Sequence, residues 1–261
     1  MVGRALAGLA LLVVLAGGCA RPVVAPLDRG TTPEVEALEE LVRSCRGAVR
    51  NLRTEARMSF RSPEGSGSAR EILLVERPDR LRVEVVGMFG TPFVLVTSGG
   101  RLAAYVAEER RVYRGVADAR TLYPYLFVEL PPRDAVDLLL GCPPWREGGH
   151  ASLFYDPTGG EWRLWRPTGG GTAQVVLFSR APHRTIGVEE HDREGLLWRA
   201  RFSGHVRVGG VEFPREISLE VPREGSRVEI EFQEPELNVS LDPLVFELRT
   251  PSGAEDVWIE G

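Results

Sequence analysis

Few side chains in this 261-residue chain are suited to covalent or metal chemistry. All 32 basic residues are arginines, which excludes Schiff-base chemistry and the phosphate-binding lysines of P-loop and kinase sites. The four histidines have no metal-ligand spacing, and we expect them in loops or at strand ends: His150, His183, His191 and His205. The sequence therefore predicts a non-enzymatic protein with no catalytic residues, no metal and no cofactor.

The charge distribution argues against binding of nucleic acid. The net charge is −5, and the arginines are scattered along the chain instead of forming one basic cluster. With 43% hydrophobic and 26% charged residues, the composition is typical of a soluble domain.

The N-terminal segment has the layout of a secretory signal. Arg4 is its one cation, residues 5–15 are apolar, and the small residues 16–18 precede Cys19. This apolar run is too short for a membrane-spanning helix. We therefore expect a signal peptide over residues 1–18.

The end of this segment resembles the lipobox of bacterial lipoproteins, in which the cysteine is lipidated and becomes the new N-terminus. Leu15 lies four residues before Cys19 and Ala16 lies at the usual leucine position, three before it. The resemblance implies lipidation of Cys19 and a tether over residues 19–32. Because residue 20 is Ala and not Asp, it also implies the periplasmic face of a Gram-negative outer membrane. The alternative is a soluble periplasmic protein whose signal happens to end in cysteine.

An amphipathic helix is expected directly after the tether. Thr32 stands at the N-cap position and Pro33 at the first helical position. Apolar residues then recur mostly at spacings of three or four from Val35 to Leu52. They form one stripe that we expect to face a core.

From Ala56 onward the apolar period changes to two, as in antiparallel strands with one polar face. A helical insert between Leu122 and Leu140, with Pro132 beginning its second part, interrupts the strands before they resume from residue 152. The fold class is therefore mainly β (α+β), an unclosed antiparallel β-barrel or strongly curved sheet. We expect one domain over residues 33–250 and a C-terminal tail over 251–261.

Three landmarks in this order resemble the LolB-like outer-membrane lipoproteins of the LolA/LolB-like superfamily. They are the helix behind the cysteine, the hairpin Val-Val-Gly-Met-Phe-Gly at residues 85–90, and a Leu-Pro…Leu-Gly-Cys-Pro segment at residues 130–143. The resemblance covers residues 50–144 well and the C-terminal strands loosely, and this chain has extra strands after residue 144.

The resemblance implies a barrel covered by the N-terminal helix and the helical insert around an apolar cavity. In that family the cavity binds acyl chains of other lipoproteins without covalent chemistry, and a periplasmic lipoprotein carrier is the implied partner of a monomeric protein. Residues 93–96 are apolar on both strand faces, as expected where one face lines a cavity and the other meets a covering element. The candidate lining residues are Phe60, Leu73, Val83, Val85, Phe93, Leu95 and Leu139.

By position, Phe89 matches the exposed apolar residue at the tip of a protruding loop in that family, with Met88 beside it. Large apolar residues between two glycines at a hairpin tip suggest contact with lipid. Equally, the two side chains could fold back onto the sheet. The same fold could also serve as a protein-binding surface in a structural accessory lipoprotein of an envelope complex.

Cys45 and Cys142 are the thiols that remain if Cys19 is lipidated, and the periplasm is oxidising. Cys45 lies on the apolar face of the first helix and Cys142 at the end of the helical insert. They form either a disulfide that holds the covering helices together or two buried free thiols.

Overall fold

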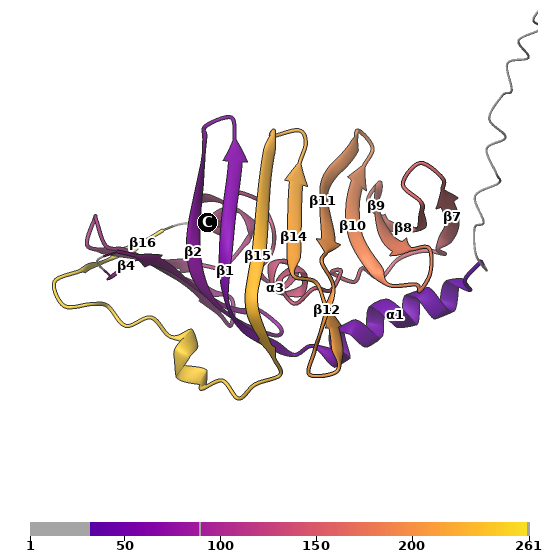
Figure 1. Ribbon diagram of the computed structural model, residues 1–261. Coiled ribbons are helices and arrows are strands. Elements are labelled where there is room, and N and C mark those ends of the chain that lie inside the picture. Colours follow the sequence, from indigo (N-terminus) through magenta and orange to yellow (C-terminus); the bar gives the residue numbers. More distant parts are fainter. Residues whose placement is uncertain (1–31, 89, 260–261) are drawn as a thin grey trace, which may run out of the picture.

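The computed structural model describes residues 32–88 and 90–259, which form a large curved β-sheet with three helices (Figure 1). The helices are α1 (Val35–Ala48), α2 (Ala119–Leu126) and α3 (Pro132–Leu139), with a short 3₁₀ helix η1 (Pro243–Phe246). The strands are β1 (Asn51–Ser62), β2 (Gly65–Glu76), β3 (Arg80–Gly87), β4 (Gly90–Ser98), β5 (Arg101–Val106), β6 (Arg111–Val116), β7 (Ser152–Asp156), β8 (Glu161–Gly169), β9 (Thr172–Ser179), β10 (Thr185–Asp192), β11 (Gly195–Ser203), β12 (Val206–Val208), β13 (Val211–Phe213), β14 (Glu216–Val221), β15 (Ser226–Leu237) and β16 (Glu255–Trp258).

Fourteen of the strands in the described residues form one sheet, in the order β16-β6-β5-β4-β3-β2-β1-β15-β14-β11-β10-β9-β8-β7. All neighbours are antiparallel except β16, which pairs parallel with β6. The two end strands do not pair, so the sheet is unclosed, which confirms the predicted fold class. β12 and β13 form a separate hairpin.

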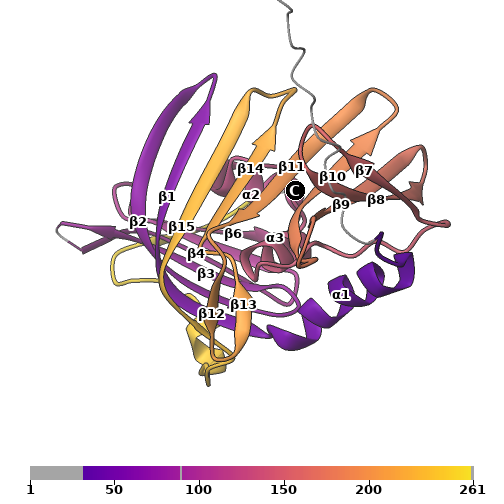
Figure 2. The same ribbon diagram turned by 45° about the vertical axis from the view of Figure 1, so that its right-hand side comes forward.

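The central pairing joins distant parts of the sequence. Along β1 and β15 the register runs from Leu52 opposite Leu237 to Arg61 opposite Arg227, with one bulge. Figures 1 and 2 show the strands curving around α2 and α3, while α1 runs across the ends of the strands near β10. The insert therefore fills the concave side of the sheet.

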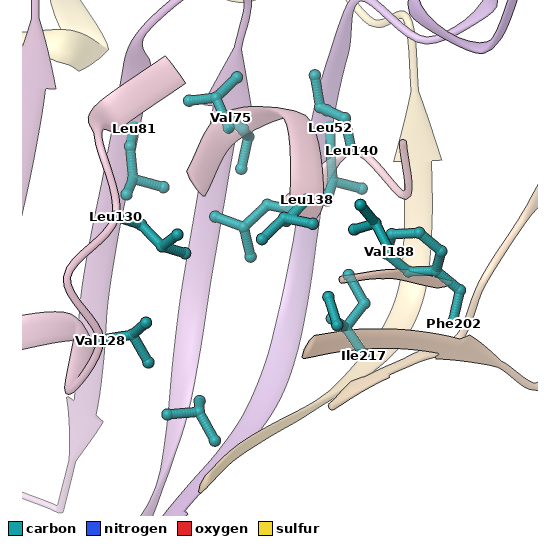
Figure 3. Packing of buried hydrophobic residues seen from close by; sticks show 14 of the residues in the cluster. Leu52, Val75, Leu81, Val128, Leu130, Leu138, Leu140, Val188, Phe202 and Ile217 are labelled. Carbon is teal, nitrogen blue, oxygen red and sulfur yellow. The ribbon is translucent and has the colours of Figure 1, made fainter. Parts of the chain in front are cut away.

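The core lies between α3 and the two halves of the sheet. Figure 3 shows Leu138 and Leu140 between strands that carry Leu52 and strands that carry Val188 and Phe202, all of them buried. Each such large apolar side chain stabilises the fold by about 1.5–3 kcal/mol through burial. The insert is therefore part of the core itself.

The outer face of β4 is also covered. Val94 and Val96 pack against Phe246 of η1, while the alternate residue Leu95 points into the main core. This explains why residues 93–96 are apolar on both faces.

Two local features differ from the sequence expectation. The first helix begins at Val35 and not at Pro33, because Glu34 still has extended dihedrals and provides no side-chain cap. Val49 and Leu52 lie beyond the end of this helix but remain in the core, since Leu52 points inward from β1. Within the segment expected to be a tail, Glu255–Trp258 forms β16, because its backbone pairs with the free edge of β6.

A disulfide joins Cys45 of α1 to Cys142, three residues after α3, with the two Cα atoms 5.9 Å apart. Near it, the buried Asp137 of α3 forms ion pairs with Arg77 and, at 3.4 Å, with Arg46 of α1. Arg77 Nε also donates to the carbonyl oxygen of Val49 at 2.9 Å. These contacts fix α1 and α3 to the end of the sheet.

Candidate functional site: an apolar cavity beneath α2

An apolar cavity of about 270 Å³ lies between the concave face of the sheet and α2. It is lined mainly by β1–β4, with α2, the residue after it, α3 and β15 completing the wall. The lining residues are Met58, Phe60, Ala69, Glu71, Leu73, Val83, Val85, Phe93, Leu95, Pro124, Tyr125, Leu126, Phe127, Leu139 and Ile230.

Strand register produces this wall. Leu73, Val83 and Leu95 lie opposite one another on β2, β3 and β4. One step of two residues along, Glu71 lies opposite Val85, which lies opposite Phe93. Because side chains alternate between faces, both rows point to the same side of the sheet.

Helix α2 and the turn after it form a lid over the cavity. The helix begins with a capping box in which Asp118 accepts from the Thr121 backbone N–H at 2.8 Å. It ends at Leu126, and the next residue, Phe127, has a positive φ of 58° that turns the chain out of the helix. The ring of Phe127 stacks on Phe60, and Tyr125 stacks on Phe93 with ring centroids 5.5 Å apart. The lid is thus held on the wall by two aromatic contacts.

Glu71 is the one charged residue in the lining, and its residue surface is 2% exposed. Among the described residues, none donates a hydrogen bond to its carboxylate and none forms an ion pair with it. Burial raises the pKa of this carboxyl from 4.5 to about 7. The cavity therefore combines an apolar wall with one unpaired acid.

All seven residues named from the sequence as cavity lining are present in this wall. Sequence reasoning missed the lid residues 124–127 and four residues of the strands, Met58, Ala69, Glu71 and Ile230. For Glu71 a signal was available, since it lies in phase with Leu73 on the inward face of its strand. The lid residues come from the helical insert, and strand periodicity does not predict where an insert packs on the sheet.

The hairpin between β3 and β4 extends an apolar side chain into solvent. Met88 is 91% exposed and Val86 is 43% exposed. A Cβ atom at Gly87 would lie 2.8 Å from the carbonyl oxygen of Gly90, so the tight approach of the two strands requires glycine there. Phe89, like Cys19, lies outside the described residues.

Two of the histidines, His191 and His183, have local partners. His191 Nε2 lies 2.9 Å from Oε2 of the buried Glu189, which also pairs with Arg163 and Arg199, and His183 Nδ1 lies 3.2 Å from the Ser179 carbonyl oxygen. In residues 32–88 and 90–259, no group of three or more His, Cys, Asp or Glu side chains could hold a metal ion. In the same residues, none of the helices has the length and apolar character needed to cross a membrane.

Comparisons by sequence find no match, neither to a protein-family profile nor to a curated protein. Solved structures with the same fold do exist. A DUF1329 family protein from Desulfovibrio piger has a TM-score of 0.58 at 16% identity, over 83% of this chain and 98% of that one. A putative outer membrane lipoprotein-sorting protein domain from Vibrio parahaemolyticus has a TM-score of 0.56 at 17% identity, over 82% and 97%.

A LolA superfamily protein from Nitrosomonas europaea has a TM-score of 0.56 at 13% identity, over 83% of this chain and 99% of that one. These identities are low, so the likeness concerns the fold. The chain has the LolA/LolB-like fold, as its sequence landmarks predicted.

Proposed function

We propose that this protein is a non-enzymatic, lipid-anchored outer-membrane lipoprotein that binds acyl chains and assists lipoprotein localisation or lipid handling in the envelope. The observation that carries the proposal is the cavity beneath α2. Its wall is apolar apart from Glu71 and the Tyr125 hydroxyl, and such a wall suits a hydrocarbon chain. The lipoprotein-sorting and LolA names of two structures with this fold are consistent with that ligand.

The proposed membrane attachment rests on the N-terminal sequence. Lipidation at Cys19 with a tether over residues 19–32 would hold the domain at the periplasmic face of the outer membrane. Several acyl chains give a stable anchor, whereas one chain gives only marginal binding. In this arrangement the β3–β4 hairpin, with Met88 and its neighbour Phe89, contacts lipid. A periplasmic lipoprotein carrier would then deliver cargo to a monomeric acceptor.

Mass spectrometry of co-purified lipid tests the proposal. A Cys19→Ser variant, which keeps every residue of the described fold and in which an ordinary cleavable secretory signal replaces residues 1–18, should purify from the periplasm with acyl lipid bound. Ala69 lines the cavity and its neighbour Arg70 is exposed on the opposite face, so Ala69→Trp should lose the lipid while Arg70→Trp keeps it.

Depletion of the protein should in turn leave lipoproteins in the wrong membrane. Correctly placed lipoproteins together with a lipid-free cavity would refute the proposal. A stable protein partner recovered with that lipid-free cavity would instead support a structural accessory role in an envelope complex.

A further inference from the structure

We propose that Glu71 is the recognition group of the cavity, where its carboxyl O–H donates a hydrogen bond to the carbonyl oxygen of a single bound acyl chain. This inference rests on the proposed binding of acyl chains. The inference adds two details to that proposal: the ligand has a polar end, and this end lies at Glu71 in the cavity wall.

Glu71 is isolated from other polar side chains in the cavity wall. The residue is 2% exposed, and its neighbours across the sheet are Ala56 on β1 and Val85 on β3. Neither can donate or accept through its side chain. Buried polar groups are nearly always hydrogen-bonded, so a carboxyl that faces a cavity without a partner points to a partner supplied by what the cavity holds.

The surroundings of Glu71 favour the neutral form of its carboxyl. Among the lining residues, Tyr125 of the lid is the only other titratable group, and burial raises its pKa above the ordinary value of 10, assisted by Tyr113 and Glu109. No cation lines the cavity within the described chain, so nothing stabilises an ionised Glu71. With the pKa of Glu71 raised to about 7, the neutral acid is abundant at neutral pH. A neutral carboxyl has an O–H to donate, and ester and amide carbonyls of acyl lipids are acceptors.

The size of the cavity limits what it can hold. At about 270 Å³, the cavity lies near the lower limit of small-molecule sites, which span about 300–1,000 Å³. This space suits one chain or part of one. A single chain whose carbonyl lies at Glu71 would lie along the apolar rows of β2–β4.

Displacement of the fluorescent apolar probe N-phenyl-1-naphthylamine tests the inference, using Cys19→Ser protein and two competitors of equal chain length, methyl decanoate and decane. At pH 6 the ester should bind roughly tenfold more tightly than the hydrocarbon, as expected for one buried hydrogen bond. Above pH 7 the affinity for the ester should fall towards the affinity for the hydrocarbon, because Glu71 ionises and loses its O–H.

Two substitutions at residue 71 separate the effect of the hydrogen bond from the effect of ionisation. The Glu71→Leu variant should still bind hydrocarbon and should bind the ester no more tightly. The Glu71→Gln variant keeps a hydrogen-bond donor, so it should retain the ester preference without its pH dependence. Glu55→Gln is the control, because Glu55 is exposed on the outer face of β1.

Equal binding of ester and hydrocarbon by the unsubstituted cavity would overturn the role of Glu71 but leave acyl-chain binding intact. An ester preference that survives in Glu71→Leu would do the same. Failure of the probe and of both competitors to bind would overturn the proposed function as well.

Discussion

Phe60 of β1 and Phe127 at the end of α2 stack with ring centroids 3.9 Å apart and ring planes inclined by 7°. This contact joins the cavity wall to its lid. Phe127 also has a positive φ, a backbone conformation that costs a side chain about 1–2 kcal/mol. The ring therefore holds the lid at a position where the backbone alone would favour glycine.

Replacement of Phe127 separates these two effects. Phe127→Ala loses the ring and keeps the backbone cost, whereas Phe127→Gly loses the ring and removes that cost. We expect the alanine variant to be destabilised by about 1–3 kcal/mol and the glycine variant by about 1 kcal/mol less. Urea denaturation measures both. An alanine variant as stable as the glycine variant would contradict a strained lid terminus.

The disulfide between Cys45 and Cys142 closes a loop of 97 residues. Because the cross-link restricts the unfolded chain, the double substitution Cys45→Ser, Cys142→Ser should lower the free energy of unfolding by about 3–5 kcal/mol. Thermal melts on the Cys19→Ser background give the measurement. Reductant should lower the Tm of the parent and leave that of the double variant unchanged; a parent insensitive to reductant would show that the bond contributes little.

Asp137 compensates a buried cation. Removing the aspartate leaves Arg77, whose side chain is 16% exposed, without its counter-ion. We expect Asp137→Ala to cost about 3–5 kcal/mol of stability. Arg46, 41% exposed, makes the matched control, and Arg46→Ala should cost about 1 kcal/mol or less. Similar losses in the two variants, measured by chemical denaturation, would argue against a special role for the Arg77 pair.

Stability should depend on pH through Glu71. The pKa of its carboxyl is raised from 4.5 to about 7 in the folded protein, so the folded state holds its proton more tightly than the unfolded state. Its stabilising contribution is complete below pH 4.5, falls as pH rises towards 7, and is lost above 7, a total of about 3 kcal/mol. The difference in unfolding free energy between Glu71→Gln and the parent should grow over this pH range. A constant difference would exclude the raised pKa.

Met88 tests the membrane contact of the β3–β4 hairpin. A charge at this exposed tip should weaken binding to phosphatidylethanolamine–phosphatidylglycerol vesicles roughly tenfold in Met88→Glu, since burial of one such side chain contributes about 1.5–3 kcal/mol. Phe89→Glu should act in the same direction, and the Tm should stay unchanged. Val116, 61% exposed on β6, is the control position for a Val116→Glu substitution. Unchanged vesicle binding in both hairpin variants would assign this tip to the solvent.

Local pattern in the sequence determined the elements. The period of two over β1–β4 follows from strand geometry, and Pro132 with Gly141 delimits the second part of the insert, since proline suits a helix start and glycine a helix end. The inward residues of β2 and β3 could be named because one face of each strand is mainly apolar and the other is mainly polar. The lid could not, because no local rule says which face of the sheet an insert covers.

Tertiary structure alone decided what those elements enclose. The pairing of β1 with β15 brings residue 52 opposite residue 237. Which strands pair depends on how much apolar surface the whole curved sheet buries, and the pattern of either strand alone does not determine it. Tertiary structure also left Glu71 without a hydrogen bond or an ion pair among the described residues: the sequence shows a glutamate in phase with Leu73, but only the packing of α2 over β1–β4 encloses it in an apolar wall. Periodicity is a property of neighbours in the chain, whereas isolation of a charge depends on everything that surrounds it.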